Sequence, residues 1–343
     1  MKTRALPALL LALALLLGGC SGGSRAAQSS FAPPEEERLV IYTSHKEEVY
    51  RPIIKEFEER TGIWVEVVTG GTNELLERIG RERENPRADV MFGGGVESLE
   101  SYRDCFTPYL CAQAEELQSQ FCSPDGLWTP FSALPVVLIY NTKLVRPGQL
   151  AGWSDLFSPE FQGKIAFADP AVSGSSFTAL ATMLSALDGG TEDVLRAFAR
   201  CLDGRQLDSS GAVLTRVAEG SDWVGITLEE TALKRIAAGD DIALVYPADG
   251  TSCVPDGSAL VRGAPHEDNA RLFLDFTAGA DVQQLLVSQF YRRSVRTDVD
   301  PVLSLPDLAQ LPLVDYDVAW VSRNRDPILM SWAFHLGGEE ELP

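Results

Sequence analysis

Short loops rich in serine, threonine and glycine recur along the chain in places where anions can bind. One of them, Ser173-Gly174-Ser175-Ser176, stands directly before an apolar segment with helical periodicity. A helix N-terminus presents unpaired backbone N–H groups and about half a positive charge, so this loop favours a small anion. Serine is also a common N-cap, which is the purely structural explanation of the same residues.

Other loops share this composition. Three of them follow expected strands in the first part of the chain, at 43–45, 69–72 and 93–95, and another follows a later strand at 250–252. Since the carboxyl ends of parallel strands meet at one edge of a sheet, we expect these loops to lie together. The candidate ligand contacts in all of these loops are Thr43, Ser44, His45, Gly71, Thr72, Gly94, Gly95, Ser173, Gly174, Ser175, Ser176, Thr251 and Ser252.

The elements that must position these loops alternate between strand and helix. A helix is expected at 47–61, for example, because its apolar residues recur at helical spacing. Such alternation predicts an α/β fold with helices on both faces of the sheet. The other expected strands are 38–42, 64–68, 89–92, 136–141, 164–167, 223–227, 242–246 and 258–261, and the other main helices are 177–187, 191–202, 212–219, 229–238 and 282–289, with one more within 266–279.

The start of the chain predicts export. Lys2 and Arg4 precede a short apolar run that ends in Leu17-Gly18-Gly19-Cys20. The run is too short to span a membrane and fits a signal peptide at 1–19, and its ending resembles a bacterial lipobox in which Cys20 is acylated. Residues 20–37 read as a flexible tether. We therefore expect an extracytoplasmic protein that is anchored to the cell membrane by lipid.

The charge balance of the chain excludes some classes of binding partner. The chain has 29 Lys and Arg against 49 Asp and Glu, a net charge of -20, which argues against nucleic acid and anionic membrane surfaces. Five cysteines besides Cys20 stand in an oxidising compartment, so two disulfides and one thiol are expected. One bridge would join two of Cys105, Cys111 and Cys122, and Cys201 with Cys253 is a candidate for the other.

Several segments together resemble the solute-binding proteins of bacterial ABC importers, in the group of ferric-ion-binding and organophosphate-binding proteins with the type II periplasmic-binding-protein fold. The resemblance covers residues 38–320. It is carried by Val40 to Glu47, Ala88 to Gly95, Tyr140-Asn141-Thr142, Ala168-Asp169-Pro170 with Ser173-Gly174-Ser175, Val224-Gly225-Ile226-Thr227, and Arg293 to Thr297.

The resemblance implies two α/β lobes that are joined by crossing strands and close around a ligand. One lobe would hold 38–135 and 249–299, the other 136–248, and 300–343 would pack across them. A membrane permease would recognise the closed form. It also implies a protein that is monomeric, has no cofactor and is not an enzyme. A secreted lipoprotein enzyme is a distant alternative, because no catalytic motif is present.

The strand ending at Thr227 bears on the choice of ligand. Iron-binding relatives carry adjacent tyrosines just after this strand, where this chain has Glu229 and Glu230. We therefore favour a small phosphorylated or phosphonate-bearing solute, with Thr227, Glu229 and Glu230 added to the candidate contacts. Ferric iron as the transported ligand is the alternative, held by His45, Glu229 and Glu230. A first-turn carboxylate can also simply stabilise its own helix.

Overall fold

The computed structural model describes residues 33–301 and 305–337. The expected signal peptide, Cys20 and most of the tether lie outside the described residues. Contacts divide the chain into two units, Met1–Glu35 and Glu36–Pro343, and the second holds every strand in the described part of the chain. Among the same residues, no helix combines the length and the apolar character that a membrane crossing requires.

The strands form one mixed sheet in the order β2-β1-β3-β9-β5-β7-β6, with β4 beside β9 and β8 beside β5. The pairs β1–β2, β1–β3 and β6–β7 are parallel, whereas β5 and β9 are antiparallel to all their neighbours. The strands are β1 (Arg38–Thr43), β2 (Trp64–Thr69), β3 (Val90–Gly95), β4 (Phe106–Thr107), β5 (Thr129–Asn141), β6 (Ile165–Ala166), β7 (Val224–Leu228), β8 (Ile242–Val245) and β9 (Cys253–Val261).

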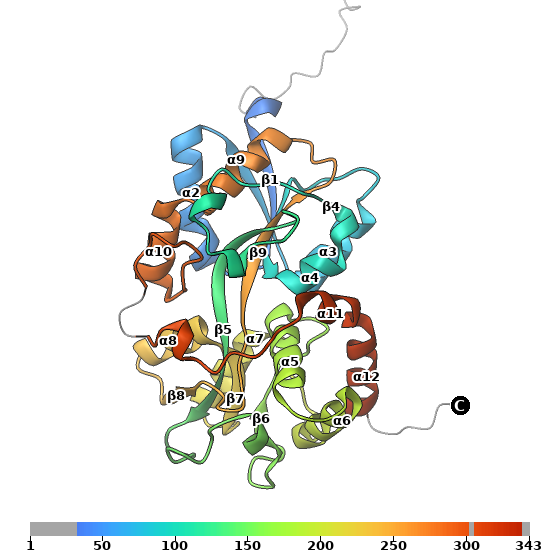
Figure 1. Cartoon of the computed structure of the whole chain (residues 1–343), viewed down its shortest axis with the longest axis vertical. Helices are drawn as coiled ribbons and strands as arrows, with labels where there is room; N and C mark the ends of the chain where they lie inside the picture. The colour runs from blue at the N-terminus through green and yellow to red at the C-terminus, as the bar shows by residue number, and fades with distance from the viewer. Residues whose placement is uncertain (1–32, 302–304, 338–343) are drawn as a thin grey trace, which may run out of the picture. The chain divides into compact units, whose positions relative to one another are not determined.

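Helices connect these strands and cover the sheet (Figure 1). The α-helices are α2 (Glu47–Thr61), α3 (Thr72–Arg81), α4 (Val96–Ser101), α5 (Gly174–Ala186), α6 (Thr191–Leu202), α7 (Ser210–Ala218), α8 (Glu229–Ala237), α9 (Glu267–Thr277), α10 (Ala280–Phe290), α11 (Val318–Arg323) and α12 (Arg325–Gly337). Short 3-10 turns lie at Glu35–Glu37, Arg103–Cys105, Ala114–Glu116, Ser119–Phe121, Trp153–Phe157 and Leu308–Gln310.

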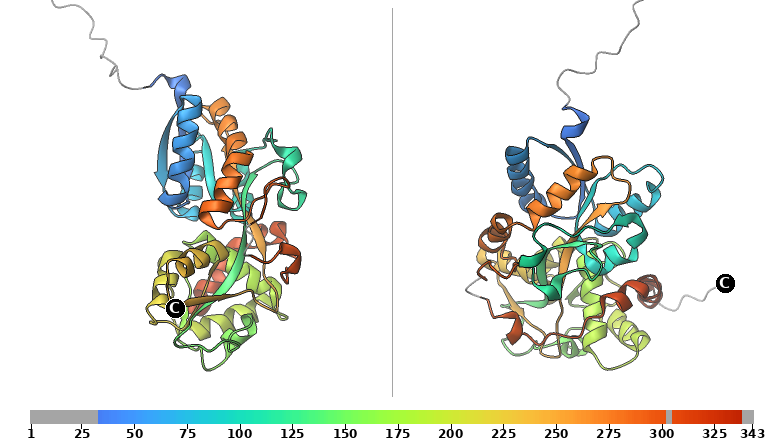
Figure 2. Two further views of the ribbon diagram at one scale, coloured as in Figure 1. Left: turned by 90° about the vertical axis from the view of Figure 1, so that its left-hand side faces the viewer. Right: turned by 45° about the horizontal axis from the view of Figure 1, so that its top comes forward.

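In the first half of the sheet, the inner strands β1 and β3 are covered on both faces. Leu39 and Ile41 of β1 pack with α2, α9 and α10, while Tyr42 of the same strand packs with α3 and α4. Adjacent residues of a strand point to opposite faces, so an unbroken apolar strand needs a helical layer on each side. Figure 2 shows these helical layers around the strands.

The second half follows the same rule. Val136 and Leu138 of β5 pack with α5, α6 and α12, whereas Val137 and Ile139 face α7 and α8. The predicted α/β fold with helices on both faces is therefore confirmed, and its strands are joined into one mixed sheet. Because β5 pairs with β9 through Thr129–Pro135 and with β7 and β8 through Val136–Asn141, it belongs to both halves.

Two strands, β5 and β9, are about twice as long as their patterns predict. The expected 136–141 is the second half of β5, and the expected 258–261 is the end of β9. The missing parts contain Pro130 and Pro135 in β5 and Pro255 in β9. Proline removes a ladder donor and normally argues against an inner strand, which is why the sequence pattern hid the region where these strands cross between the halves.

The expected disulfides are wrong, because all five cysteines from Cys105 onward are free thiols in the structure. Cys201 on α6 packs in one hydrophobic core, and Cys253 belongs to a different cluster. Cys111 and Cys122 share that second cluster, but the Cys122 thiol contacts the carbonyl oxygen of Gln118 instead, at 3.5 Å. Burial raises the pKa of Cys253 to about 12.

Candidate functional site

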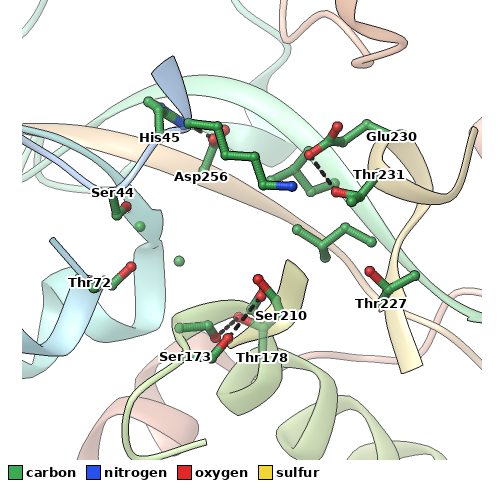
Figure 3. Close-up of a pocket in the computed structure, with 18 of the residues that line it drawn as sticks. Ser44, His45, Thr72, Ser173, Thr178, Ser210, Thr227, Glu230, Thr231 and Asp256 are labelled. Carbon is green, nitrogen blue, oxygen red and sulfur yellow. Dashed lines mark hydrogen bonds and ion pairs between the residues drawn. The ribbon is translucent and has the colours of Figure 1, made fainter. Parts of the chain in front are cut away.

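A cavity of about 330 Å³ opens where the two halves of the sheet meet (Figure 3). Its walls come from the loops after β1 and β2, the ends of β3 and β7, the first turns of α3, α5, α7 and α8, part of β9, and the segment after α10. The carboxyl ends of β1, β2 and β3 lie together here because these strands are parallel neighbours.

In the described part of the chain, five helices of nine residues or more begin at this cavity. Their N-cap residues all line it: Lys46 of α2, Gly71 of α3, Ser173 of α5, Ser209 of α7 and Leu228 of α8. Each helix start contributes about half a positive charge and backbone N–H groups that lack helical acceptors. The cavity therefore attracts an anion even though the protein as a whole is acidic.

Hydroxyl groups gather on one side of the cavity. The hydroxyl of Ser173 lies 3.1 Å from that of Ser175 and accepts from the backbone N–H of Ser176 at 3.3 Å, which makes it the cap of α5. Thr72 approaches from the first half of the sheet, and a β-carbon on Gly174 would lie 2.8 Å from its hydroxyl oxygen. Glycine at 174 thus allows the two halves to approach closely.

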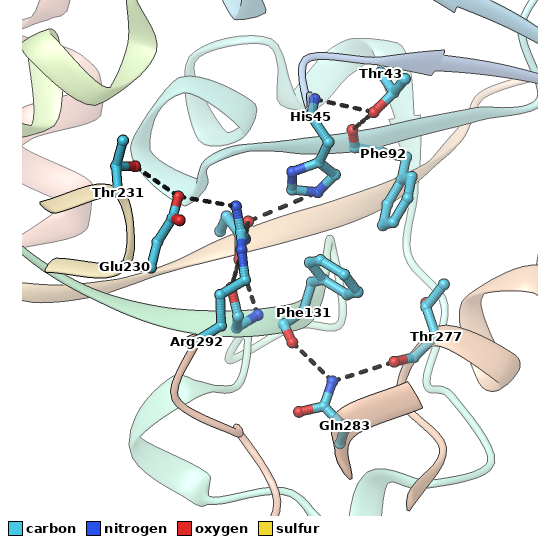
Figure 4. Close-up of polar contacts among 11 residues, drawn as sticks. Thr43, His45, Phe92, Phe131, Glu230, Thr231, Thr277, Gln283 and Arg292 are labelled. Carbon is cyan, nitrogen blue, oxygen red and sulfur yellow. Dashed lines mark hydrogen bonds and ion pairs between the residues drawn. The ribbon is translucent and has the colours of Figure 1, made fainter. Parts of the chain in front are cut away.

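Charged groups occupy another wall. The guanidinium of Arg292 donates to Asp256 at 2.7 Å and to the hydroxyl of Ser132 at 2.8 Å, and it reaches Glu230 at 3.4 Å. All three charged side chains are buried. In Figure 4 a dashed line joins Arg292 to the carboxylate of Glu230. A buried charge is costly unless paired, so this arrangement fixes Arg292 in place.

The carboxylate of Glu230 is held in its charged form. Burial pushes the pKa of Glu230 upward, but the cations Arg292, Lys234 and Lys46 outweigh burial and bring the pKa below its ordinary value. The ammonium of Lys234 lies 3.2 Å from the second carboxylate oxygen of Glu230. The hydroxyl of Thr231 donates to the first at 2.8 Å.

His45 sits beside this network as a neutral ring. Burial, with the charges on Arg292 and Lys234, holds the pKa of His45 well below its ordinary value. Its Nε2 lies 3.7 Å from Asp256, and the ring packs against Phe92 and Phe131 at centroid distances of 4.5 and 5.0 Å. His45 can therefore donate or accept one hydrogen bond at the cavity wall without bringing a charge.

Several polar contacts tie the two halves together near the cavity. The amide of Asn73 donates to the carbonyl oxygen of Ala171 at 2.6 Å. The hydroxyl of Thr178 on α5 donates to the carboxyl group of Glu97 at the start of α4. Burial raises the pKa of Glu97. These contacts join α3 and α4 to the region around α5, so separating the halves would break them.

Most of the residues expected from the sequence do meet at the cavity. They come from both halves of the sheet, which explains why they are scattered along the chain. Those that line it are Ser44, His45, Gly71, Thr72, Gly94, Gly95, Ser173, Gly174, Ser175, Thr227 and Glu230.

Five expected residues lie outside the lining and hold the framework instead. The hydroxyl of Thr43 donates to the carbonyl oxygen of Phe92, and that of Thr251 donates to the carbonyl oxygen of Val136. Ser252 pairs with Thr182, and Ser176 lies within the first turn of α5. Glu229 forms a two-pronged ion pair with Arg293 at 2.8 Å and accepts from Tyr246.

Sequence reasoning missed the cations and part of the polar lining. Lys46 and Lys234 carried no distinctive pattern, but Arg292 begins the basic run Arg292 to Arg296, which was a usable signal. Asp256 lies in the first part of β9, which the sequence pattern did not predict. The missed polar residues are Lys46, Thr178, Asp208, Ser209, Ser210, Thr231, Lys234, Asp256 and Arg292.

The ferric set expected from the sequence is not assembled. Glu229 is paired with Arg293. Glu230 is paired with Lys234 and Arg292. Within the described ranges, no group of three or more His, Cys, Asp or Glu side chains is placed to hold a metal ion.

Comparisons with known proteins bear on this site. The sequence model of the family described as "Bacterial extracellular solute-binding protein" matches residues 89–319. A "Putative 2-aminoethylphosphonate-binding periplasmic protein" of Salmonella typhi is 26% identical over 270 residues, which cover 74% of this chain and 75% of the relative. "Iron uptake protein A1" of Synechocystis is 26% identical over 282 residues, 77% of each chain.

Solved structures share the fold. The periplasmic binding protein AfuA from Actinobacillus pleuropneumoniae, solved with exogenous fructose-6-phosphate bound, superposes with a TM-score of 0.82 at 24% identity. The match covers 88% of this chain and 99% of AfuA.

Proposed function

The chain belongs to the family of bacterial extracellular solute-binding proteins, and we propose that the solute it captures is a small compound bearing a phosphate or phosphonate group. As the solute-binding component of an ABC importer, it acts outside the cytoplasmic membrane and delivers its ligand to a permease. The observation that carries the ligand proposal is the convergence of five helix N-termini on one cavity that also contains Arg292, Lys46 and Lys234.

The phosphoryl group is assigned to the hydroxyl side of the cavity. Ser173 and Ser175, the backbone at the start of α5 and Thr72 offer several neutral donors within a small volume. Oriented neutral donors and helix dipoles are sufficient to bind a phosphate. The printed name of the Salmonella relative supports the same ligand class.

Ferric iron is the second candidate, because the Synechocystis relative is named for iron uptake. Hard anionic oxygen ligands suit Fe³⁺, but no tyrosine among the described residues lines this cavity, and its carboxylates Glu230 and Asp256 are paired with arginine or lysine. Holding the metal would require those ion pairs to break. The phosphorylated solute therefore remains the favoured ligand.

Thermal unfolding with a ligand panel separates the two candidates. We expect phosphate esters or phosphonates to raise the melting temperature of ligand-free protein, because a ligand that binds only the folded state stabilises it by about 2.7 kcal/mol at a hundredfold excess over Kd. Ferric citrate should produce no phenolate-to-iron absorption band. Stoichiometric coloured iron binding, with no response to any phosphorylated compound, would transfer the assignment to iron.

Capture is proposed to involve closure of two lobes. We assign 38–135 with 249–299 to one lobe, 136–248 to the other, and 300–343 to a segment packed across both. The contacts of α11 with α4 and of α12 with α6 support the last assignment. Small-angle scattering with and without a bound solute tests closure, since an unchanged radius of gyration would contradict it.

We further propose that Cys20 carries a lipid, that the receptor is a monomer, and that it holds no cofactor and catalyses no reaction. Replacing Cys20 by Ala should abolish fatty-acid labelling and release the protein from the membrane fraction or leave its leader uncleaved. Cys201→Ala is the matched control and should leave labelling intact. Fatty-acid labelling that survives in Cys20→Ala would refute the proposed lipid anchor.

Light scattering of the purified protein tests the proposal that the receptor is a monomer.

A further inference from the structure

Three buried polar atoms on the charged wall make no hydrogen bond within the described residues. They are Nε2 of His45, Oε2 of Glu230 and Nε of Arg292. All three side chains line the cavity and are at least nine-tenths buried. The Glu230 oxygen has only an ion-pair contact with Lys234, at 3.2 Å. Buried polar atoms are nearly always satisfied, so a ligand is the natural partner for these atoms.

The three atoms differ in whether they can donate or accept a hydrogen bond. The Glu230 oxygen can only accept, the Arg292 nitrogen can only donate, and the neutral His45 ring can do either. A hydroxyl group both donates and accepts, so a ligand with neighbouring hydroxyls can satisfy acceptor and donor together. An ammonium group has three donors and no acceptor, and would leave the Arg292 nitrogen unsatisfied.

The charges around Glu230 also favour a hydroxyl group over an ammonium group. Glu230 is flanked by the cations Arg292 and Lys234, and Asp256 is already bonded to Arg292. An ammonium group placed against Glu230 would therefore lie close to at least two positive charges. A neutral hydroxyl meets no such repulsion.

The cavity also has room for more than a phosphoryl group. Ser173, Ser210 and Thr178 lie on one side of it, and His45, Asp256 and Glu230 lie across from them (Figure 3). At roughly 30 Å³ for each water-sized group, the volume holds about eleven such groups, well beyond a single phosphate. A phosphoryl group at the serines thus leaves space for a substituent that reaches the charged wall.

We propose that this substituent is polyhydroxylated and uncharged, so that the solute is a sugar phosphate or polyol phosphate rather than an amino-phosphonate. The inference rests on the proposed function, because it assumes that the phosphoryl group lies at the serine side. His45, Glu230 and Arg292 would then select the ligand by its hydroxyl groups.

A matched pair of ligands tests the proposal. 2-Hydroxyethylphosphonate and 2-aminoethylphosphonate share the phosphonate and differ only in the terminal hydroxyl or ammonium. Calorimetric titration of ligand-free protein should give a Kd at least tenfold lower for the hydroxyl compound. Glycerol 3-phosphate, with one more hydroxyl, should bind at least as tightly as the hydroxyl compound, and inorganic phosphate serves as the reference for the serine side alone.

The outcomes separate the inference from the proposed function. Equal or tighter binding of the amino compound, or a hydroxyl preference below tenfold, would overturn the hydroxyl assignment while the phosphate site stood. The same holds if glycerol 3-phosphate binds less tightly than 2-hydroxyethylphosphonate. If inorganic phosphate, both phosphonates and glycerol 3-phosphate all fail to bind, the proposed function itself is refuted, and the inference falls with it.

Discussion

Replacing Ser175 by Asp is expected to lower the affinity for a phosphorylated solute by about a thousandfold. The new carboxylate would stand at the start of α5, among the hydroxyls assigned to the phosphoryl group. Two like charges about 4 Å apart repel by about 4 kcal/mol at an effective dielectric constant of 20, and about 1.4 kcal/mol corresponds to a tenfold change in Kd. Calorimetric titration of the variant measures the loss.

The fold should not suffer from this change. An acidic residue in the first turn stabilises a helix by about 0.3–1 kcal/mol, so the melting temperature without ligand should hold or rise slightly. Ser175→Asn is the matched control, because it has the size of Asp without the charge, and its loss of affinity should be far smaller. If Asn and Asp weaken binding equally, the anion is not bound at this helix start.

Arg292→Met carries the largest expected cost in stability, about 3–5 kcal/mol near neutral pH. The substitution removes the cation that Asp256 and Glu230 share, so that the buried Asp256 loses its arginine partner and Glu230 keeps only Lys234. Chemical denaturation of ligand-free protein measures the difference. Arg292→Lys keeps a positive charge at the site and should lose clearly less, so equal losses in the two variants would argue against an electrostatic origin.

The cost of Arg292→Met should depend on pH in one direction. Burial raises the pKa of Asp256 even with Arg292 present, and without Arg292 burial is less opposed. A carboxyl whose pKa is higher in the folded than in the unfolded protein supports stability below its unfolded pKa, about 3.9 for Asp, and loses that support as the pH rises through the folded pKa. The deficit should therefore shrink toward acid pH. A deficit that grew on acidification would contradict this.

The sequence located the backbone-rich part of the site because that part depends on local rules. Glycine and serine at strand ends and helix starts, such as Gly71 and Ser173, follow from capping and turn chemistry that operate over a few residues. Parallel pairing of β1 with β2 and β3 then brings such loops together. Neither step needs knowledge of distant contacts.

The charged wall could not be found in this way. Arg292 meets Asp256 and Glu230 across 36 and 62 positions of sequence, through packing that no short pattern encodes. Asp256 lies on β9, whose Pro255 and Gly257 depart from the expected composition of an inner strand. The choice between Glu229 and Glu230 was likewise settled by tertiary partners, since adjacent residues of one helix face different surroundings.

The position of β9 in the chain has a kinetic consequence. This strand lies in the middle of the sheet, between β3 and β5, yet it is made after more than 250 residues. Until it arrives, β3 has an unpaired edge, and one face of the first half lacks α9 and α10. Contacts so distant in sequence form slowly, because the intervening chain must first be closed into a loop. A growing polypeptide therefore cannot complete the sheet of its amino-terminal half until β9 has been made.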